Sequence, residues 1–187
     1  MNHEWDGGWW RDALRVPSPN FSARPAGARV DTVVLHSISL PPGEYGGDAV
    51  ERLFTNTLDW SAHPYYEKIR GLVVSAHFFV RRDGALLQFV SCDERAWHAG
   101  ASCWQGRDDC NDFSIGIELE GLEGETFEAA QYATLAPLLA NVARHYPVAA
   151  VVGHEHVAPG RKNDPGAGFD WPRLRRLARA PKLRYGV

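Results

Sequence analysis

The chain has 187 residues, of which 44% are hydrophobic and 23% are charged. This length favours one domain over residues 1–187, and the composition excludes a disordered chain, a coiled coil and a collagen-like repeat. A formal net charge of −3 provides no basic excess for neutralising phosphates, so we expect no nucleic-acid partner. No apolar stretch approaches the roughly 18 to 20 residues that span a bilayer, so we expect no membrane partner.

The N-terminal residues 1–29 are rich in proline, glycine and arginine and predict an irregular arm. This segment lacks the basic start and apolar run of a secretion signal. The three cysteines, Cys92, Cys103 and Cys110, form a small, odd-numbered set that is typical of reduced thiols. Both observations favour a cytoplasmic protein, in which Cys110 is expected to be a buried packing residue.

An α/β core is predicted over residues 30–180, and it begins with a strand. Residues 30–36 are a β-branched run that ends in a histidine, which is typical of a strand buried on both faces. Two prolines and three glycines make residues 37–47 a loop. Asp48 is then placed to cap a helix. The apolar face of this helix is expected to carry Val50, Leu53, Phe54 and Leu58.

Residues 75–90 predict a hairpin, because two apolar runs flank an Asp-Gly pair, which is a strong turn signal. A long loop follows over residues 91–112 and contains Trp97 and His98. A loop of this length inside a compact domain favours a functional role. Several of the seven tryptophans lie outside obvious strands, and we expect them to stack on a ring-shaped or apolar ligand.

Residues 113–120 alternate between apolar and polar side chains, as in a strand. Glu118 shares a face with two small residues, Ser114 and Gly116, which leave space beside its carboxylate. Glu118 is therefore a candidate general base. Glu120 lies on the same face nearer the strand end, where exposure to solvent is expected. The spacing alone does not choose between the two glutamates.

The last third of the chain predicts two helices around a short strand. Residues 126–146 have helical spacing, and Pro137 is expected to kink or split this helix. Residues 148–153 form an apolar strand that runs into His154, and a final helix starts near Asp170. The alternating strands and helices, together with the hairpin, indicate an α/β domain with a mixed central sheet.

His36 and His154 each stand at the carboxyl end of a predicted strand, the edge at which open α/β sheets bind ligands. Asp164 is placed to return to this edge through a loop stiffened by two prolines. Two imidazoles and one carboxylate are donors of a catalytic zinc site. Lys162 faces the same way as Asp164 in an extended segment and is placed to stabilise an oxyanion. His156 is the alternative third ligand.

Five segments of the chain carry a resemblance to a known family. Together they resemble the zinc amidases of the N-acetylmuramoyl-L-alanine amidase type 2 family, from about Arg15 to Trp171. The resemblance implies a single amidase domain with a mixed sheet flanked by helices, as in peptidoglycan-recognition proteins. The segments are LHSISLPPGEYGG (35–47), SAHFFVRRDG (75–84), RAWHAG (95–100), CNDFSIGIELEG (110–121) and GHEHVAPGRKNDPG (153–166).

This resemblance also implies site residues and a reaction. It implies one zinc ion held by His36, His154 and Asp164. It gives the acid/base role to Glu118 and a catalytic role to Lys162. The implied reaction is hydrolysis of the amide between the lactyl group of 1,6-anhydro-N-acetylmuramic acid and L-alanine of the stem peptide, in the recycling of cell-wall peptidoglycan. We expect a small muropeptide as the substrate and a monomeric enzyme.

Three positions depart from the pattern of the family. Ser37 follows the first expected ligand where close relatives often have asparagine. Val73 and Asp109 stand where some members carry arginines, which leaves recognition of the acidic end of the peptide open. The candidates for substrate contact are Trp97, His98, Arg107 and Arg161.

Two other functions remain open at this point. An amidase of polymeric peptidoglycan, like envelope or phage enzymes, would need export or a lysis system. A non-catalytic peptidoglycan-binding module of the same fold would keep the groove but need no metal ligands or acid/base residue. A zinc metallopeptidase of unrelated fold is disfavoured, because the chain has no HExxH motif.

Overall fold

A mixed seven-stranded sheet forms the centre of the computed structural model, which describes residues 4–186. Residues 1–3 and 187, which the predicted arm and domain include, lie outside the described residues. The strands of the sheet are β3 (Leu14–Arg15), β5 (Thr32–Ile38), β6 (Phe78–Val80), β7 (Leu86–Gln88), β11 (Ser114–Glu120), β12 (Ala150–Gly153) and β13 (Arg184–Tyr185).

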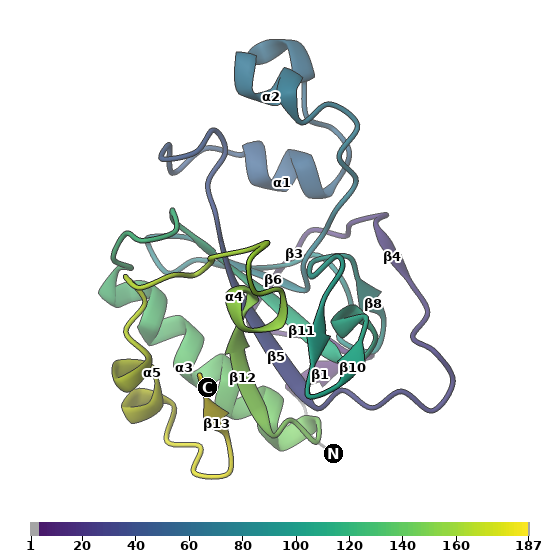
Figure 1. Ribbon diagram of the computed structural model, residues 1–187, viewed down its shortest axis with the longest axis vertical. Coiled ribbons are helices and arrows are strands. Elements are labelled where there is room, and N and C mark those ends of the chain that lie inside the picture. Colours follow the sequence, from purple (N-terminus) through teal and green to yellow (C-terminus); the bar gives the residue numbers. More distant parts are fainter. Residues whose placement is uncertain (1–3, 187) are drawn as a thin grey trace.

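The strand order is β13-β12-β5-β11-β6-β7-β3. The strands from β13 to β6 are parallel, β7 is antiparallel to β6, and β3 is parallel to β7. Helices pack on the sheet, and α1 and α2 lie at the opposite end of the view from α5 (Figure 1). The helices are α1 (Ala49–Phe54), α2 (Pro64–Lys68), α3 (Ala129–His145), α4 (His154–Val157) and α5 (Trp171–Ala178). The predicted α/β fold with a mixed sheet flanked by helices is therefore confirmed.

Strands β5 and β11 lie in the middle of the sheet, and most of their side chains are therefore buried, on both faces. On one face, Leu35 and Ile117 belong to the same apolar cluster as Leu138 of α3. The opposite face of β5 carries Val34, which belongs to a separate cluster, and then His36. Alternation along each strand therefore directs the apolar residues towards α3 and the polar site residues to the other side of the sheet.

Most of the predicted helices and strands are present, but some begin or end at other residues than predicted. The hairpin of β6 and β7 and the strands β5, β11 and β12 are confirmed. The helix after Asp48 ends at Phe54, so Leu58 is buried beyond the helix rather than on its face. The predicted split at Pro137 is wrong, because α3 continues through it. The packing of neighbouring Ala136 and Leu138 in the core offsets the lost hydrogen bond.

The N-terminal arm contributes two tryptophans to the core and one strand to the main sheet, whereas the sequence predicts an irregular arm. Strand β3 adds to the edge of the main sheet by pairing with β7. Trp5 and Trp10 are buried and stacked, with ring centroids 6.1 Å apart, so neither is available to a ligand. The Trp10 amide donates to Gln88 Oε1 at 2.7 Å, which fixes the arm against β7.

The 91–112 loop is built from short paired segments rather than being free of structure. Cys92 and Cys110 within it are buried, as predicted for Cys110. The remaining elements of the described chain are two-residue strands in three antiparallel pairs and two short 3-10 turns. They are β1 (Trp5–Asp6) with β2 (Trp9–Trp10), β4 (Phe21–Ser22) with β8 (Arg95–Ala96), β9 (Cys103–Trp104) with β10 (Arg107–Asp108), η1 (Trp60–Ala62) and η2 (Cys110–Asp112).

Candidate active site

Three adjacent parallel strands bring polar side chains to one edge of the sheet. Glu118 of β11 is the register partner of His36 in β5. Gly153 of β12 is the partner of Leu35, so His154, the next residue, lies beside His36 at the start of α4. The predicted meeting of two strand-end histidines is thus a consequence of parallel pairing.

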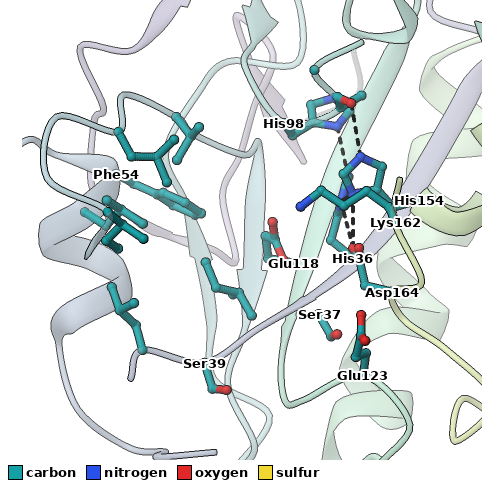
Figure 2. A pocket seen from close by; sticks show the side chains of 18 of the residues that line it. His36, Ser37, Ser39, Phe54, His98, Glu118, Glu123, His154, Lys162 and Asp164 are labelled. Carbon is teal, nitrogen blue, oxygen red and sulfur yellow. Dashed lines mark hydrogen bonds and ion pairs between the residues drawn. The ribbon is translucent and has the colours of Figure 1, made fainter. Parts of the chain in front are cut away.

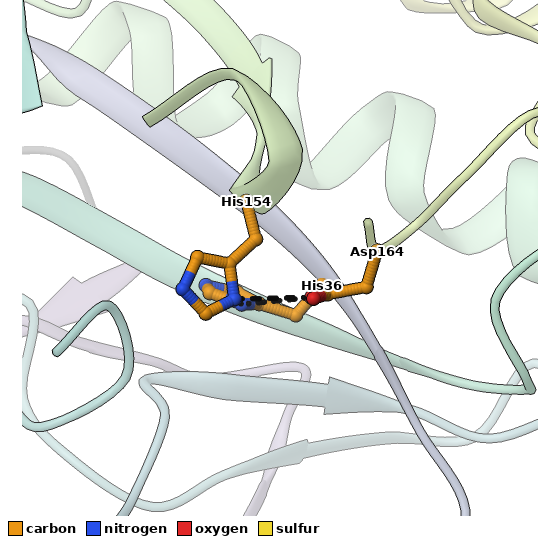
Figure 3. A group of neighbouring side chains, drawn as sticks. All are labelled: His36, His154 and Asp164. Carbon is orange, nitrogen blue, oxygen red and sulfur yellow. Dashed lines mark hydrogen bonds and ion pairs between the residues drawn. The ribbon is translucent and has the colours of Figure 1, made fainter. Parts of the chain in front are cut away.

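Asp164 completes a compact cluster with the two histidines. His36 Nδ1 lies 2.9 Å from His154 Nδ1 and 3.3 Å from Asp164 Oδ2, and His154 Nδ1 lies 3.2 Å from the same oxygen. All three side chains are buried, and their donor atoms face one another (Figure 3). The backbone carbonyl of Asp164 accepts from the Glu155 amide, which holds the returning loop against α4. These three donors are placed to hold one metal ion.

His156 is not part of this cluster. Its Nδ1 accepts a hydrogen bond from the Gly153 amide at 2.8 Å, and its ring lies beside Trp171. The alternative of His156 as the third donor is therefore wrong, because its ring turns back onto the start of α4.

A cavity of about 760 Å³ opens in front of the cluster. In Figure 2 the carboxylate of Glu118 lies between the cluster and the Phe54 side of this cavity. Lys162 extends from the cluster side towards the same space (Figure 2). The cavity therefore has a polar wall and an apolar wall. The apolar wall is formed by Leu40, Leu53, Phe54, Ile69, Leu72, Val73 and Val74.

Glu118 is buried, and its Oε2 has no hydrogen-bond partner among the described residues. Burial raises the pKa of Glu118 well above its ordinary value, the negative charge of Asp164 raises it further, and Lys162 opposes the change. A carboxyl group whose pKa is raised in this way is suited to both accepting and returning a proton.

Glu120 is also buried, which corrects the expectation that it is exposed to solvent. Its Oε1 accepts from the Gly46 amide, and its Oε2 accepts from the Arg82 amide at 2.9 Å. The two backbone donors pull the carboxylate into the base of the loop after β5 and away from solvent. Glu120 is therefore fully engaged in holding two loops, unlike Glu118.

The predicted substrate contacts have different surroundings. Trp97 and His98 line the cavity, although His98 is buried and both its ring nitrogens are engaged. Arg161 also lines the cavity, but its guanidinium donates to the carbonyl groups of Ala99 and Ala101. It is therefore held by the protein itself.

Arg107 does not line this cavity, contrary to the expectation of a substrate contact. It forms a bidentate ion pair with Asp31, with Nη1–Oδ2 and Nη2–Oδ1 distances of 2.8 and 3.0 Å. Its guanidinium lies over the ring of Phe113. Of the three departures from the family pattern, Ser37 and Val73 line the cavity, whereas Asp109 does not.

Several residues that support the site are not predicted from the sequence. Asn111 is the clearest example, because its Oδ1 accepts from the amides of both His98 and Ala99. The part of the apolar wall that follows α2, which includes Leu72, is likewise not predicted. No local pattern marks either feature, since the contacts join residues more than ten positions apart.

Comparison with known proteins gives consistent matches over most of the chain. Residues 26–167 match the family described as N-acetylmuramoyl-L-alanine amidase. The chain is 51% identical over 172 residues to the 1,6-anhydro-N-acetylmuramyl-L-alanine amidase AmpD of Escherichia coli K12, covering 91% of this chain and 94% of that protein.

None of the described helices is long and apolar enough to cross a membrane.

Two solved structures extend the comparison to the fold. A crystal structure of a selenomethionine derivative of AmpD matches with a TM-score of 0.90 and 51% identity, covering 92% of this chain and 97% of that chain. The amidase AmiD of E. coli, in complex with the substrate anhydro-N-acetylmuramic acid-L-Ala-D-gamma-Glu-L-Lys, matches with a TM-score of 0.60 and 29% identity, covering 83% of this chain and 60% of that chain.

Proposed function

Because the chain belongs to the N-acetylmuramoyl-L-alanine amidase family, we propose that it hydrolyses the amide between the lactyl group of 1,6-anhydro-N-acetylmuramic acid and L-alanine of the stem peptide. The observation that carries this proposal is the three-donor cluster beside the buried Glu118, whose Oε2 has no partner in the described part of the chain, at one cavity. The 51% identity to enzymes named for this reaction supports it, and peptidoglycan recycling is the corresponding process.

One zinc ion is the metal we propose for His36, His154 and Asp164. Ligand atoms at zinc distances in a tetrahedral site lie about 3.3 Å from one another. The three donor atoms here are separated by 2.9 to 3.3 Å, so they fit this metal with little rearrangement. Two neutral imidazoles and a carboxylate also suit zinc better than the hard cations that require oxygen ligands.

The chain's own residues supply the proton transfers and the electrostatic stabilisation. Glu118 takes a proton from the attacking water and returns it to the amine nitrogen as the carbon–nitrogen bond breaks. Lys162 faces the oxygen that gains negative charge as the carbonyl carbon becomes tetrahedral. A zinc ion held by the cluster would add Lewis acidity at this carbonyl.

The cavity wall offers few cationic side chains for contact with the substrate. Trp97 is placed on the cavity wall to contact the sugar or the peptide. Arg161 is held by backbone carbonyls, and Val73 presents an apolar surface that is 49% exposed, so neither provides a free cation for the acidic end of the stem peptide. Lys162 is the remaining lysine or arginine among the described residues of the cavity wall.

The deciding experiment is hydrolysis of purified anhydro-muramyl tripeptide, followed by mass spectrometry. We expect free tripeptide, whose release stops when zinc is chelated and returns when zinc is added. Intact substrate in the presence of bound zinc would favour a non-catalytic binding role or another muramyl amide. Faster release of peptide from intact sacculi than from soluble muropeptide would favour the polymer as substrate. Cell fractionation and light scattering test the predicted cytoplasmic location and monomeric state.

A further inference from the structure

A line of hydrogen bonds leads from His36 away from the cavity and into the protein interior. His36 Nε2 lies 3.0 Å from His98 Nδ1, and His98 Nε2 lies 3.3 Å from Ser114 Oγ. Ser114 Oγ in turn lies 2.6 Å from the backbone carbonyl oxygen of Cys110. His36, His98 and Ser114 are all buried, so their polar atoms depend on one another rather than on solvent.

The proton positions along this line follow from its inner end. A carbonyl oxygen only accepts, so the hydroxyl of Ser114 donates to Cys110 and its oxygen accepts from His98 Nε2. His98 contacts no carboxylate in the described part of the chain, and as a buried neutral ring it has a bare Nδ1. His36 must therefore donate to it from Nε2. The lone pair of His36 Nδ1 is left facing the cluster with His154 and Asp164.

The position of the His98 ring is fixed by the residues around it. A Cβ atom at Gly116 would lie 2.3 Å from His98 Cγ and 2.6 Å from Nδ1, so only glycine at this place in β11 leaves room for the ring. Asn111 Oδ1 accepts from the His98 and Ala99 amides at 3.1 and 2.8 Å. The space that small residues leave on β11 is thus occupied by His98.

We propose that His98 is a positioning residue, which holds His36 in the tautomer and ring orientation that offer Nδ1 to the metal (Figure 2). This inference rests on the proposed function. The neighbouring Ala99 acts in the same way on His154, because its carbonyl accepts from His154 Nε2 at 3.0 Å. Two consecutive residues of one loop therefore orient both imidazoles. This role replaces the substrate contact that the sequence predicts for His98.

The first test measures zinc affinity by competition with a chromophoric chelator. Partners that orient a metal-binding histidine contribute about 10- to 100-fold to metal affinity, so we expect His98→Phe to bind zinc more weakly by this factor. His98→Asn, which keeps an acceptor near the position of Nδ1, should recover part of the loss. Gly116→Ala should weaken binding as well, because its methyl group displaces the ring without changing its chemistry.

A matched control separates positioning from general damage to the interior. His77 is a buried histidine whose ring centroid lies 5.8 Å from that of His98, but it bonds to the Gly116 amide rather than to His36. His77→Phe should therefore reduce the free energy of unfolding and leave zinc affinity within about twofold of the wild type. Circular dichroism establishes that each variant is folded at the temperature of the assay.

The second test observes the tautomer directly by long-range ¹H–¹⁵N NMR of the imidazole rings. We expect the His36 proton on Nε2 in the wild type and a mixture of tautomers in His98→Phe. Wild-type zinc affinity in a folded His98→Phe, or an unchanged His36 tautomer, would overturn the positioning role alone. Failure of the wild-type protein to bind zinc would overturn the proposed metal site together with this inference.

Discussion

Glu118 and Glu120 lie two residues apart on the same face of β11, but their carboxylates differ in hydrogen bonding. Glu118 Oε2 has no hydrogen-bond partner within residues 4–186, whereas both oxygens of Glu120 accept from backbone amides. We expect Glu118→Gln to lower kcat/KM at least about 100-fold, because the amide cannot accept the proton. Zinc binding should be retained. Hydrolysis rates and zinc content measured on the same sample check this prediction.

Glu120→Gln is the matched control for that substitution. The amide keeps one acceptor oxygen but places a donor opposite a backbone N–H group, so we expect a loss of about 1 to 3 kcal/mol in the free energy of unfolding. The value of kcat should change by no more than a few fold. If Glu120→Gln abolished turnover and Glu118→Gln did not, the assignment of the two carboxylates would have to be exchanged.

His77 makes the stability of the fold depend on pH. Burial lowers the pKa of His77 to about 3, and the positive charge of Arg24 contributes to this change. Below about pH 6.5 the unfolded chain binds a proton that the folded protein does not bind, so stability falls as the pH is lowered. We expect His77→Phe to weaken this dependence by about 1.4 kcal/mol per pH unit between pH 6 and pH 4. Urea unfolding in the presence of a chelator measures it, and parallel slopes for the two proteins would contradict it.

At the scale of elements, a segment could be predicted where its own residues decide its structure. Strand β5 begins with the β-branched residues Thr32, Val33 and Val34, β12 is a short apolar run, and the turn between β6 and β7 is set by Asp83 and Gly84. Helix α2 was missed because it has only five residues, and the two-residue strands carry no periodic pattern. The position of β3 at the sheet edge depends on pairing with residues more than 70 positions away. Such contacts leave no local signal.

The N-terminal arm is tied to the site loop by one guanidinium group. Arg24 donates to the backbone carbonyls of Cys92, Asn111, Asp112 and Ser114, which belong to the segment that carries His98 and its supports. An ammonium group cannot satisfy four acceptors arranged around a planar fork. We therefore expect Arg24→Lys to lower the free energy of unfolding by about 2 to 4 kcal/mol.

Denaturant unfolding measures this loss, and Arg29→Lys is the control, because Arg29 lies in the same arm and is exposed. An equal effect of the two substitutions would show that the carbonyls do not depend on Arg24. Weaker zinc binding in Arg24→Lys would further indicate that the arm supports the metal site through the loop.

At the scale of the whole molecule, the sequence predicts those site residues whose positions follow from the direction of the parallel strands. His36 and His154 meet because β5 and β12 are parallel and run towards the same edge of the sheet, which the sequence pattern is sufficient to predict. Glu118 joins them because it is the register partner of His36. Arg107 is held outside the cavity by Asp31, which is 76 residues away, so no local pattern reveals this position. The support of His36 by His98 spans 62 residues and was invisible for the same reason.

The proposed metal would link three segments of the chain, a strand, a helix and a loop, through one ion. Its three donors come from β5, the start of α4 and the loop at Asp164. A ligand that binds only the folded state stabilises it by about 2.7 kcal/mol at 100 times its dissociation constant. For a chain of this length we therefore expect zinc to raise Tm by roughly 5 to 10 °C.

Thermal unfolding with zinc and with chelator checks this expectation. The control is His154→Ala, which removes one donor from the cluster and should reduce the difference between the two conditions to about 1 °C or less. An equal increase of Tm in the wild type and in His154→Ala would place the stabilising zinc ion elsewhere on the protein. An increase confined to the wild type would link the stability of the whole fold to the edge of the sheet where His36 and His154 meet.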